Sequence, residues 1–442
     1  MSQPPNVIII GGGIGGLASA LFCKKAGLNP TVYESRESQK HEYGGGLQVA
    51  PNGIAVLDML GLATELEENG HVATGMSFRN HKGEELCKLS HQQPSITGYP
   101  AVNCKRWTLL RLLEEECERK GVTIKYSKQF ERLEDVHTST PVAVFQDGEQ
   151  ARGDLIIGAD GIHSTVRKIL FPTKKPEYTG IVGAGGFLDS KHREDIAQAE
   201  AEQSLILIFG KKSFFGFSRC APLSNHHPFM WWSTFPCQKS PDELRNLTEE
   251  DIRSMLKELH HDWIPPIPNL VAKGDSLILT RICDIAHLDS WYEGRVILLG
   301  DAAHAVSPHS GQGASMALED AVYLCKLLKD TPSEKWDTVG KRFEEGRKDR
   351  CEKIIEAGRK SANQKKELGD FGCWVRDMFV KLFMKKLISS TYGPVFRYRV
   401  QWEGDFPAND GGESSRLNYW IPVVVASVAV AVCVFWRPSL LF

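Results

Sequence analysis

Residues 7–27 read VIIIGGGIGGLASALFCKKAG. The β-branched run Val7–Ile10 is typical of a buried parallel strand, and Leu17–Ala26 carries its apolar residues on one helical face. Pro30–Glu34 (PTVYE) predicts the next strand, which ends in an acidic residue. The three segments together predict a βαβ unit.

The glycines between the first strand and the helix have the spacing Gly11-x-Gly13-x-x-Gly16. Glycines at these positions allow a tight turn and let backbone N–H groups approach a pyrophosphate at the positive end of the helix. Glu34 then follows at the distance at which an acidic residue binds the adenosine ribose hydroxyls. The motif predicts a dinucleotide site but does not distinguish FAD from NAD.

Composition excludes several classes of protein. The chain has 442 residues, enough for two sizeable cores, and a formal net charge of -2 with acidic and basic residues interleaved. No basic stripe is present, so we expect no nucleic-acid partner. The 11 cysteines show no metal-ligand spacing, so we expect reduced, buried thiols and no metal.

Two further buried strands, Asp154–Ala159 and Arg295–Gly300, belong to the parallel type, whereas aromatic-rich alternating segments within 171–280 predict an antiparallel sheet. The predicted fold class is α/β, α+β overall: a Rossmann-like FAD-binding domain with an inserted, mostly antiparallel β-sheet domain, C-terminal helices and one transmembrane helix. The predicted boundaries are 1–75, 101–170 and 281–330 for the FAD-binding domain, 76–100 and 171–280 for the substrate domain, 331–400 for a helical region, 401–416 for a linker and 417–436 for the membrane span.

The C-terminal segment Leu417–Trp436 has no charged residue and about the 20 residues that a bilayer core requires. Aromatic residues flank it, as in the belts of membrane helices: Tyr419, Trp420 and Trp436. The alternative is a buried C-terminal helix. We expect a single-pass, tail-anchored protein with its catalytic domain in the cytosol, at the endoplasmic reticulum.

Two more motifs place carboxylates after buried strands. Asp160-Gly161 follows the strand 154–159, and Gly300-Asp301 ends the strand 295–300. Gly311 and Gly313 then open a helix, whose free N–H groups can stabilise negative charge. Asp160 alone is equally compatible with an ordinary strand-to-helix turn.

The order and spacing of these three motifs resemble the single-component flavoprotein monooxygenases typified by para-hydroxybenzoate and salicylate hydroxylases; zeaxanthin epoxidase and FAD-dependent urate hydroxylase are similar. The likeness extends from about Val7 to about Ile355. It implies that Asp160 serves FAD and NAD(P)H, that Asp301 holds the ribityl chain, and that Arg106 contacts the pyrophosphate side. It further implies that the isoalloxazine is lined by Gly46 on one side and by Pro308, Gly311, Gly313 and Ala314 on the other.

The chain departs from this family at two places. Ser315 stands where many relatives have Asn, so a flavin-edge contact there would come from the backbone. Gly185 stands where several relatives have a catalytic arginine, which leaves the catalytic residue unknown. Arg193 and Arg219 are nearby candidates.

The resemblance implies that NAD(P)H reduces the flavin, that O2 forms a C4a-hydroperoxide, and that one oxygen atom reaches the substrate. We expect a lipophilic small-molecule substrate of secondary metabolism (aromatic, polyketide, alkaloid or terpenoid) that is hydroxylated or epoxidised. The aromatic residues of the central sheet would line its pocket: Phe215, Phe217, Trp231 and Trp232. The alternatives are a flavin-dependent reductase of the same fold and a membrane adaptor without activity.

Overall fold

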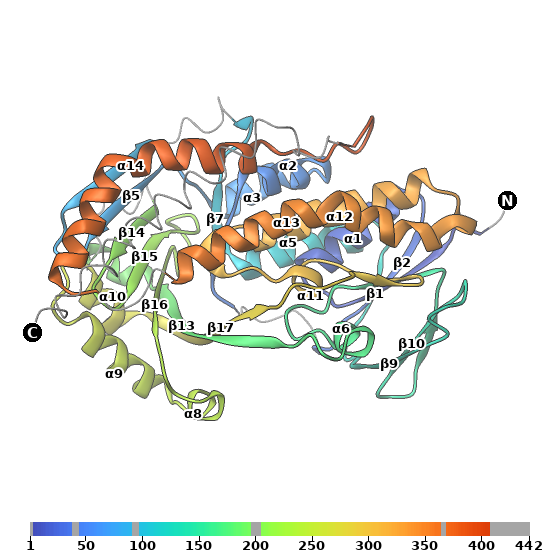
Figure 1. The fold of residues 1–442 in the computed structure, drawn as a ribbon, viewed down its shortest axis with the longest axis horizontal. Helices are drawn as coiled ribbons and strands as arrows, with labels where there is room; N and C mark the ends of the chain where they lie inside the picture. The colour runs from blue at the N-terminus through green and yellow to red at the C-terminus, as the bar shows by residue number, and fades with distance from the viewer. Residues whose placement is uncertain (1–2, 38–43, 91–96, 196–204, 364–367, 407–442) are drawn as a thin grey trace, which may run out of the picture.

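The structure is a computed structural model that describes residues 3–37, 44–90, 97–195, 205–363 and 368–406. Figure 1 shows two groups of elements side by side: parallel strands under helices α1, α5, α12 and α13, and a second sheet beside α9 and α10. A long helix, α14, runs along the outside of the second group and returns toward α2.

The first sheet has six strands in the order β18-β19-β12-β1-β2-β8. Strand β1 (Asn6–Ile10) pairs in parallel with β2 (Asn29–Tyr33) and with β12 (Leu155–Gly158), and β12 pairs with β19 (Val296–Leu298). Strand β8 (Thr123–Lys125) is also parallel, and only β18 (Tyr292–Glu293) is antiparallel. The predicted βαβ unit is therefore present, and the three motifs follow the carboxyl ends of β1, β12 and β19.

Helices bury this sheet because their apolar faces are broad. Helix α1 (Ile14–Lys25) is buried from Leu17 to Cys23, and it packs against α5 (Arg106–Arg119) and α12 (Gly313–Asp330). Helix α12 is buried over most of its length, including the acidic residues Glu319 and Asp320. Burial of two adjacent carboxylates in one helix requires cationic partners, which helix α13 (Val339–Asn363) provides.

The second sheet has seven strands in the order β17-β13-β16-β15-β14-β5-β6. Its neighbours are antiparallel except for β14 (Leu205–Phe209), which runs parallel to β5 (Gly75–Asn80). The long strands β13 (Pro176–Leu188) and β17 (Asp275–Ile285) connect it to the first sheet. One face of β15 (Phe214–Arg219) and β16 (Phe229–Pro236) packs against α9 (Glu249–His260) and α10 (Ile267–Lys273).

The remaining elements complete the two groups. They are β3 (Gly46–Val49), α2 (Pro51–Met59), α3 (Ala63–Asn69), β4 (His71–Val72), β6 (Glu85–Ser90), β7 (Val102–Lys105), β9 (Phe130–Glu134), β10 (Val142–Phe145), β11 (Gln150–Arg152), α6 (Thr165–Leu170), η1 (Ser190–Asp195), α8 (Pro241–Arg245), α11 (Asp301–His304), η2 (Pro308–Ser310), η3 (Ser333–Thr338) and α14 (Asp370–Arg397).

The start of the interval predicted as a linker is packed. Trp402 is 9% exposed, and its ring lies 5.3 Å from that of Phe22 in α1. Lys326 of α12, 1% exposed, donates to the carbonyl oxygens of Gln401 and Gly404. Val400, Trp402 and Phe406 thus attach residues 400–406 to the core of the first group, and 407–416 lie outside the described residues.

The predicted membrane localisation requires correction. Within the described part of the chain, no helix combines the length and the apolar character needed to cross a bilayer. We therefore do not retain the tail-anchored protein of the endoplasmic reticulum, or the membrane as a partner. The segment Leu417–Trp436, on which that prediction depended, lies outside the described residues.

Candidate active site

The glycine turn after β1 is shaped by close backbone contacts. Gly11 has φ +107°, and a Cβ there would lie 2.5 Å from the carbonyl oxygen of Ala159. A Cβ at Gly16 would overlap the carbonyl oxygen of Gly11, whereas a Cβ at Gly13 would have no neighbour within 4 Å. The first and third glycines therefore permit the turn, and the middle glycine faces open space at the uncapped N-terminus of α1.

Glu34 closes this turn from the end of β2. Its Oε2 accepts from the backbone N–H of Gly12 at 2.7 Å, and its Oε1 accepts from Nε and the backbone N–H of Arg36, both at 3.0 Å. Burial would raise the pKa of Glu34, but the hydrogen bonds and charge of Arg36 and the Gly12 bond outweigh it and lower the pKa. Glu34 is therefore an ionised acceptor beside the glycine turn.

Asp160 lies at the end of β12, across from the glycine turn. Its Oδ2 accepts from the backbone N–H groups of Thr165 and Val166 at 2.7 and 3.1 Å, which caps α6. Its Oδ1 is buried and has no hydrogen-bond partner among the described residues. Burial raises the pKa of this carboxyl, so a donor supplied by a ligand would satisfy a group that otherwise carries a desolvation cost.

The third motif brings a carboxylate to a helix N-terminus. Asp301 begins α11, and its Oδ1 lies 3.9 Å from the Cβ position of Gly313, the first residue of α12. The N-terminus of α12 has no side-chain cap, and Gly311 before it has φ +62° with open space around its Cβ position. Burial raises the pKa of Asp301, although His304, Arg106 and Arg167 oppose it.

The other predicted flavin contacts surround this helix end. Pro308 begins η2 and is exposed, and Ala314 is half-buried in the first turn of α12. Arg106 begins α5; its backbone N–H donates to the carbonyl oxygen of Gly45 at 3.0 Å, and its side chain lies beside the Cβ position of Gly44. Ser315 is buried, and its Oγ accepts from the backbone N–H of Ala50 at 3.1 Å, so it joins α12 to α2.

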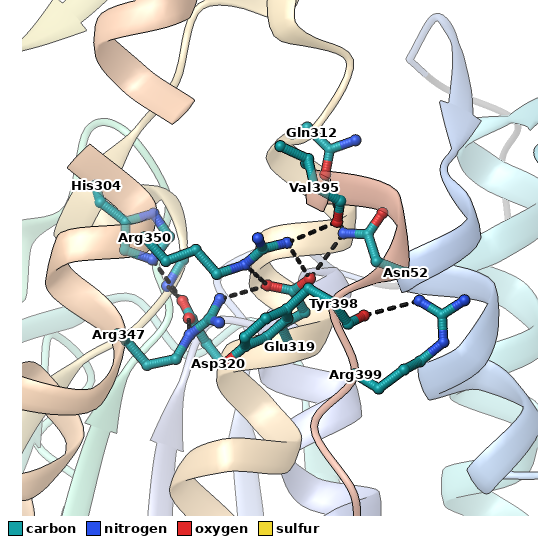
Figure 2. A network of polar contacts seen from close by, with 11 residues as sticks. Asn52, His304, Gln312, Glu319, Asp320, Arg347, Arg350, Val395, Tyr398 and Arg399 are labelled. Atoms are coloured by element: carbon teal, nitrogen blue, oxygen red, sulfur yellow. Dashed lines mark hydrogen bonds and ion pairs between the residues drawn. The ribbon is translucent and has the colours of Figure 1, made fainter. Parts of the chain in front are cut away.

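Behind this site lies a buried ion network, which Figure 2 shows. Asp320 accepts from Arg347 Nε at 2.8 Å, from the backbone N–H of Gly300 at 3.1 Å and from His304 Nε2. Glu319 accepts from Arg347 Nη2 at 2.7 Å and from Arg350. The network fixes the residue before Asp301, so it supports the turn that carries the predicted ribityl contact.

The network reaches the C-terminal segment and α2. The guanidinium of Arg350 lies 3.9 Å from the ring centroid of Tyr398 and donates to the carbonyl oxygen of Val395 at 3.0 Å. Asn52 donates to Glu319 at 2.8 Å. Burial alone would lower the pKa of His304, but Cys351 and Asp320 raise it well above its ordinary value. We read the convergence of His304, Asp320 and Cys351 as part of this network.

The central sheet does not bring the four predicted substrate residues to one face. Three predicted substrate residues pack in the core between the sheet and the helices α9 and α10: Phe215, Phe217 and Trp231. Phe215 and Trp231 stack with ring centroids 5.6 Å apart. These three side chains therefore lie on the helix-covered face of the sheet and not on the expected pocket wall. Alternation along β16 sends the neighbouring side chains of Trp231 and Trp232 to opposite faces.

Trp232 lies on the other face, which meets the first group. Its ring covers the Cβ position of Gly216, and it packs beside Met230 and Phe187. A Cβ at Gly46 would overlap the sulfur of Met230, so β3 lies against this face. Of the four predicted substrate residues, Trp232 alone is directed toward the side of the sheet that faces the predicted isoalloxazine loops.

The predicted catalytic arginines are not brought to a common site. Arg219 ends β15, and its Nε donates to the carbonyl oxygen of Ala221 at 2.9 Å. Arg193 lies in η1, and its side chain is outside the described residues. Gly185 pairs with Trp232 across β13 and β16, and a Cβ there would lie 2.5 Å from the carbonyl oxygen of Trp231. A larger residue at 185 would therefore require the strands to move apart.

Sequence reasoning missed the ion network and a polar chain on the sheet. Asn103, fully buried, donates to Ser218 Oγ at 2.7 Å and accepts from Gln48 Nε2 at 2.8 Å. The adjacent acids Glu319 and Asp320 inside an apolar helix were a signal for the network. No comparable signal marked the polar chain, because its members lie far apart in sequence.

The donors and acceptors present fit FAD. Open space at Gly13, the uncapped starts of α1 and α12, and the carboxylates of Glu34 and Asp301 suit phosphates, a flavin edge and sugar hydroxyls. The unpartnered Oδ1 of Asp160 calls for a further donor at the same site.

Comparison with known proteins agrees with this fit. A protein family described as "FAD binding domain" matches residues 5–357. The FAD-dependent urate hydroxylase of Klebsiella pneumoniae is 32% identical over 332 residues, which cover 74% of this chain and 82% of that protein. The aurachin C monooxygenase/isomerase of Stigmatella aurantiaca is 27% identical over 85% of this chain and 94% of its own.

Solved structures show the same fold. Klebsiella pneumoniae HpxO complexed with FAD and uric acid superposes with a TM-score of 0.71 at 24% identity, covering 96% of this chain and 97% of that one. The family match spans most of the chain and includes every motif described above. The chain therefore belongs to the FAD binding domain family and is, like these relatives, an FAD-dependent monooxygenase.

Proposed function

We propose that the protein uses NAD(P)H and O2 to hydroxylate or epoxidise a lipophilic, planar small molecule of secondary metabolism. The observation that carries the substrate class is the half-buried Trp232, which packs on the buried side chains of Met230 and Phe187 on the sheet face that meets β3. Because the ring of Trp232 covers Gly216 and is only half-buried, it offers an aromatic surface on which a planar substrate can stack. Urate and 6-hydroxynicotinate, which appear in the names of two similar enzymes, are also planar molecules.

The proposed cofactor roles follow from the contacts. Glu34 accepts hydrogen bonds from the adenosine ribose, the glycine turn 11–16 binds the pyrophosphate together with Arg106, and Asp301 holds the ribityl hydroxyls. Asp160 offers its free Oδ1 to the cofactor. Four residues around η2 and α12, together with Gly46, would line the flavin: Pro308, Gly311, Gly313 and Ala314.

Bound FAD supplies the redox chemistry that activates O2. The chain's own task is to exclude water, place the substrate and stabilise charge. The N–H groups at the start of α12 would stabilise negative charge at the flavin edge. Arg193 and Arg219 stay candidates for a catalytic side chain, and Nε of Arg219 donates to the carbonyl oxygen of Ala221.

The test is NAD(P)H oxidation by the FAD-loaded protein under air and under argon, with a panel of planar aromatic compounds. We expect product that contains one oxygen atom from O2, and none under argon. Equal turnover under argon with another electron acceptor would favour a reductase. In the Trp232→Ala variant the KM for the substrate should rise roughly tenfold, with the FAD spectrum unchanged, because one stacking contact contributes about 0.5–1.5 kcal/mol beyond its buried area.

A further inference from the structure

Helix α14 carries exposed apolar side chains on its outer side. We call them the α14 stripe and define it by Phe371, Trp374, Met378, Leu382 and Phe383. Six large apolar side chains are exposed in the described ranges, and these five are among them. The first four recur at intervals of three or four residues, so they lie on one helical face. Contiguous exposed apolar patches mark interaction sites in soluble proteins, so the stripe is a candidate docking surface.

Ring contacts make the stripe continuous along the helix. The rings of Phe371 and Trp374 lie 6.0 Å apart, and those of Phe379 and Phe383 lie 5.3 Å apart. Met378 lies one turn after Trp374 and joins the two ring pairs. Trp374 is 60% exposed, so this apolar surface meets solvent and is not the edge of a buried core.

The opposite side of α14 holds the helix in place and directs the stripe outward, along the outside of the second group (Figure 1). Val380 is buried in a small apolar cluster with Phe78 of β5 and Leu86 of β6. Asp377 accepts from Asn80 Nδ2 at 3.1 Å. The helix is therefore apolar on both sides, and the second sheet covers only one of them.

Phe406 lies close to the C-terminal end of this helix. Tyr398 directly follows α14, and the guanidinium of Arg347 lies 5.5 Å from its ring centroid. The ring of Phe406 lies 4.5 Å from that of Tyr323, and a Cβ at Gly346, the residue before Arg347, would overlap the Tyr323 hydroxyl. The chain after 406 therefore starts from the neighbourhood in which α14 ends.

The sequence after Phe406 contains an apolar segment within reach of the stripe. Residues 407–442 lie outside the described residues, and 417–436 among them carry no charge. Phe383 precedes Arg397 by 14 residues, which is about 21 Å along the helix. The intervening residues 407–416 can span up to about 33 Å, so 417–436 can reach the stripe.

We propose that the α14 stripe is the docking surface for this chain's own segment 417–436. Contact between an uncharged segment and an apolar stripe removes both from water and buries no unpaired charge. The tether 407–416 holds the segment near the stripe at an effective concentration on the order of millimolar. This tethering favours the segment over a second copy of the chain, which has to arrive by diffusion.

The test places the photo-reactive amino acid p-benzoylphenylalanine at Met378 in the full FAD-loaded chain. After irradiation we expect a product that migrates as one chain, in which α14 is joined to the tryptic peptide that begins at Leu417. A product with the mass of two chains would assign the stripe to a second copy and overturn the proposal. Cross-links only to phosphatidylcholine vesicles added to the sample, or no cross-link to protein, would also overturn it.

Two variants sharpen this test. The photo-reactive residue at Lys257, which is exposed on α9, is the matched control and should give no cross-link to the 417 peptide. Leu382→Asp places a carboxylate on the stripe, and the cross-link yield from position 378 should fall roughly tenfold or more, with the FAD spectrum unchanged. An unchanged yield would show that apolar docking does not hold the segment, and it would contradict the proposal.

Discussion

Replacement of Arg347 by methionine tests whether the buried ion network supports the FAD site. Arg347 is fully buried and bridges Asp320 and Glu319 through two bonds of 2.8 and 2.7 Å. Methionine fills part of the same volume but supplies no donor. Asp320 would keep His304 and the Gly300 N–H at Oδ2, and its Oδ1 would be left buried without a partner.

The expected cost follows from this arrangement. Removal of one partner from a buried ion pair costs about 3–5 kcal/mol, because the remaining charge stays desolvated. Glu319 keeps Arg350 and Asn52, so we expect about 3 kcal/mol, near the lower limit. Against a total stability of about 5–15 kcal/mol, this is a large fraction.

Urea unfolding of the FAD-loaded protein, followed by flavin fluorescence, measures this loss. With a slope of about 3 kcal/mol per M, the midpoint should fall by about 1 M. The matched control is Lys341→Met on the same helix: its pair with Glu345 is 3.8 Å long, and both side chains are mostly exposed. That variant should lose less than about 1 kcal/mol. If the two midpoints fall equally, the network does not stabilise the site.

Three further outcomes are expected. Glu34→Gln should weaken FAD binding roughly 10- to 100-fold, as an ionised acceptor is lost; fluorescence titration measures it, and the exposed Glu37→Gln should bind FAD normally. Gly16→Ala should prevent FAD uptake, because its Cβ would overlap a backbone carbonyl, and a normal yellow protein would contradict this. Burial lowers the pKa of His260 to about 4, below the 6.5 of an unfolded chain, so stability is lost as pH falls through this window. Between pH 7 and pH 5 the loss should be about 2 kcal/mol in urea unfolding; His260→Gln should remove most of this pH dependence, and the exposed His261→Gln should keep it.

Much of the FAD-binding part could be predicted because its signals are local. The βαβ unit and the glycine spacing lie within about 30 residues, so strand, turn and helix patterns fix their own relative positions. Asp160 and Asp301 follow buried strands, and parallel strands bring their carboxyl ends to one edge of a sheet.

The sequence did not predict which face of the central sheet lines the site. A period of two predicts that a strand has two faces, but it does not tell which face meets which layer. Phe215 and Trp231 are as aromatic as Trp232, but only tertiary packing against α9 and α10 decides that they are core. The ion network joins Asp320 to Arg347 and to Tyr398 through contacts that no local pattern encodes. The uncharged character of 417–436 and its flanking aromatic residues led to the membrane localisation that required correction.

The packing of residues 400–406 has a consequence for how the protein is made. Phe22 lies in α1, and its aromatic partner Trp402 is synthesised 380 residues later. At about 5–20 residues per second, the nascent chain would wait roughly 20 to 80 s before that contact can form. During this time the side of α1 that carries Phe22 lacks its final aromatic partner, so this apolar surface stays open through most of synthesis.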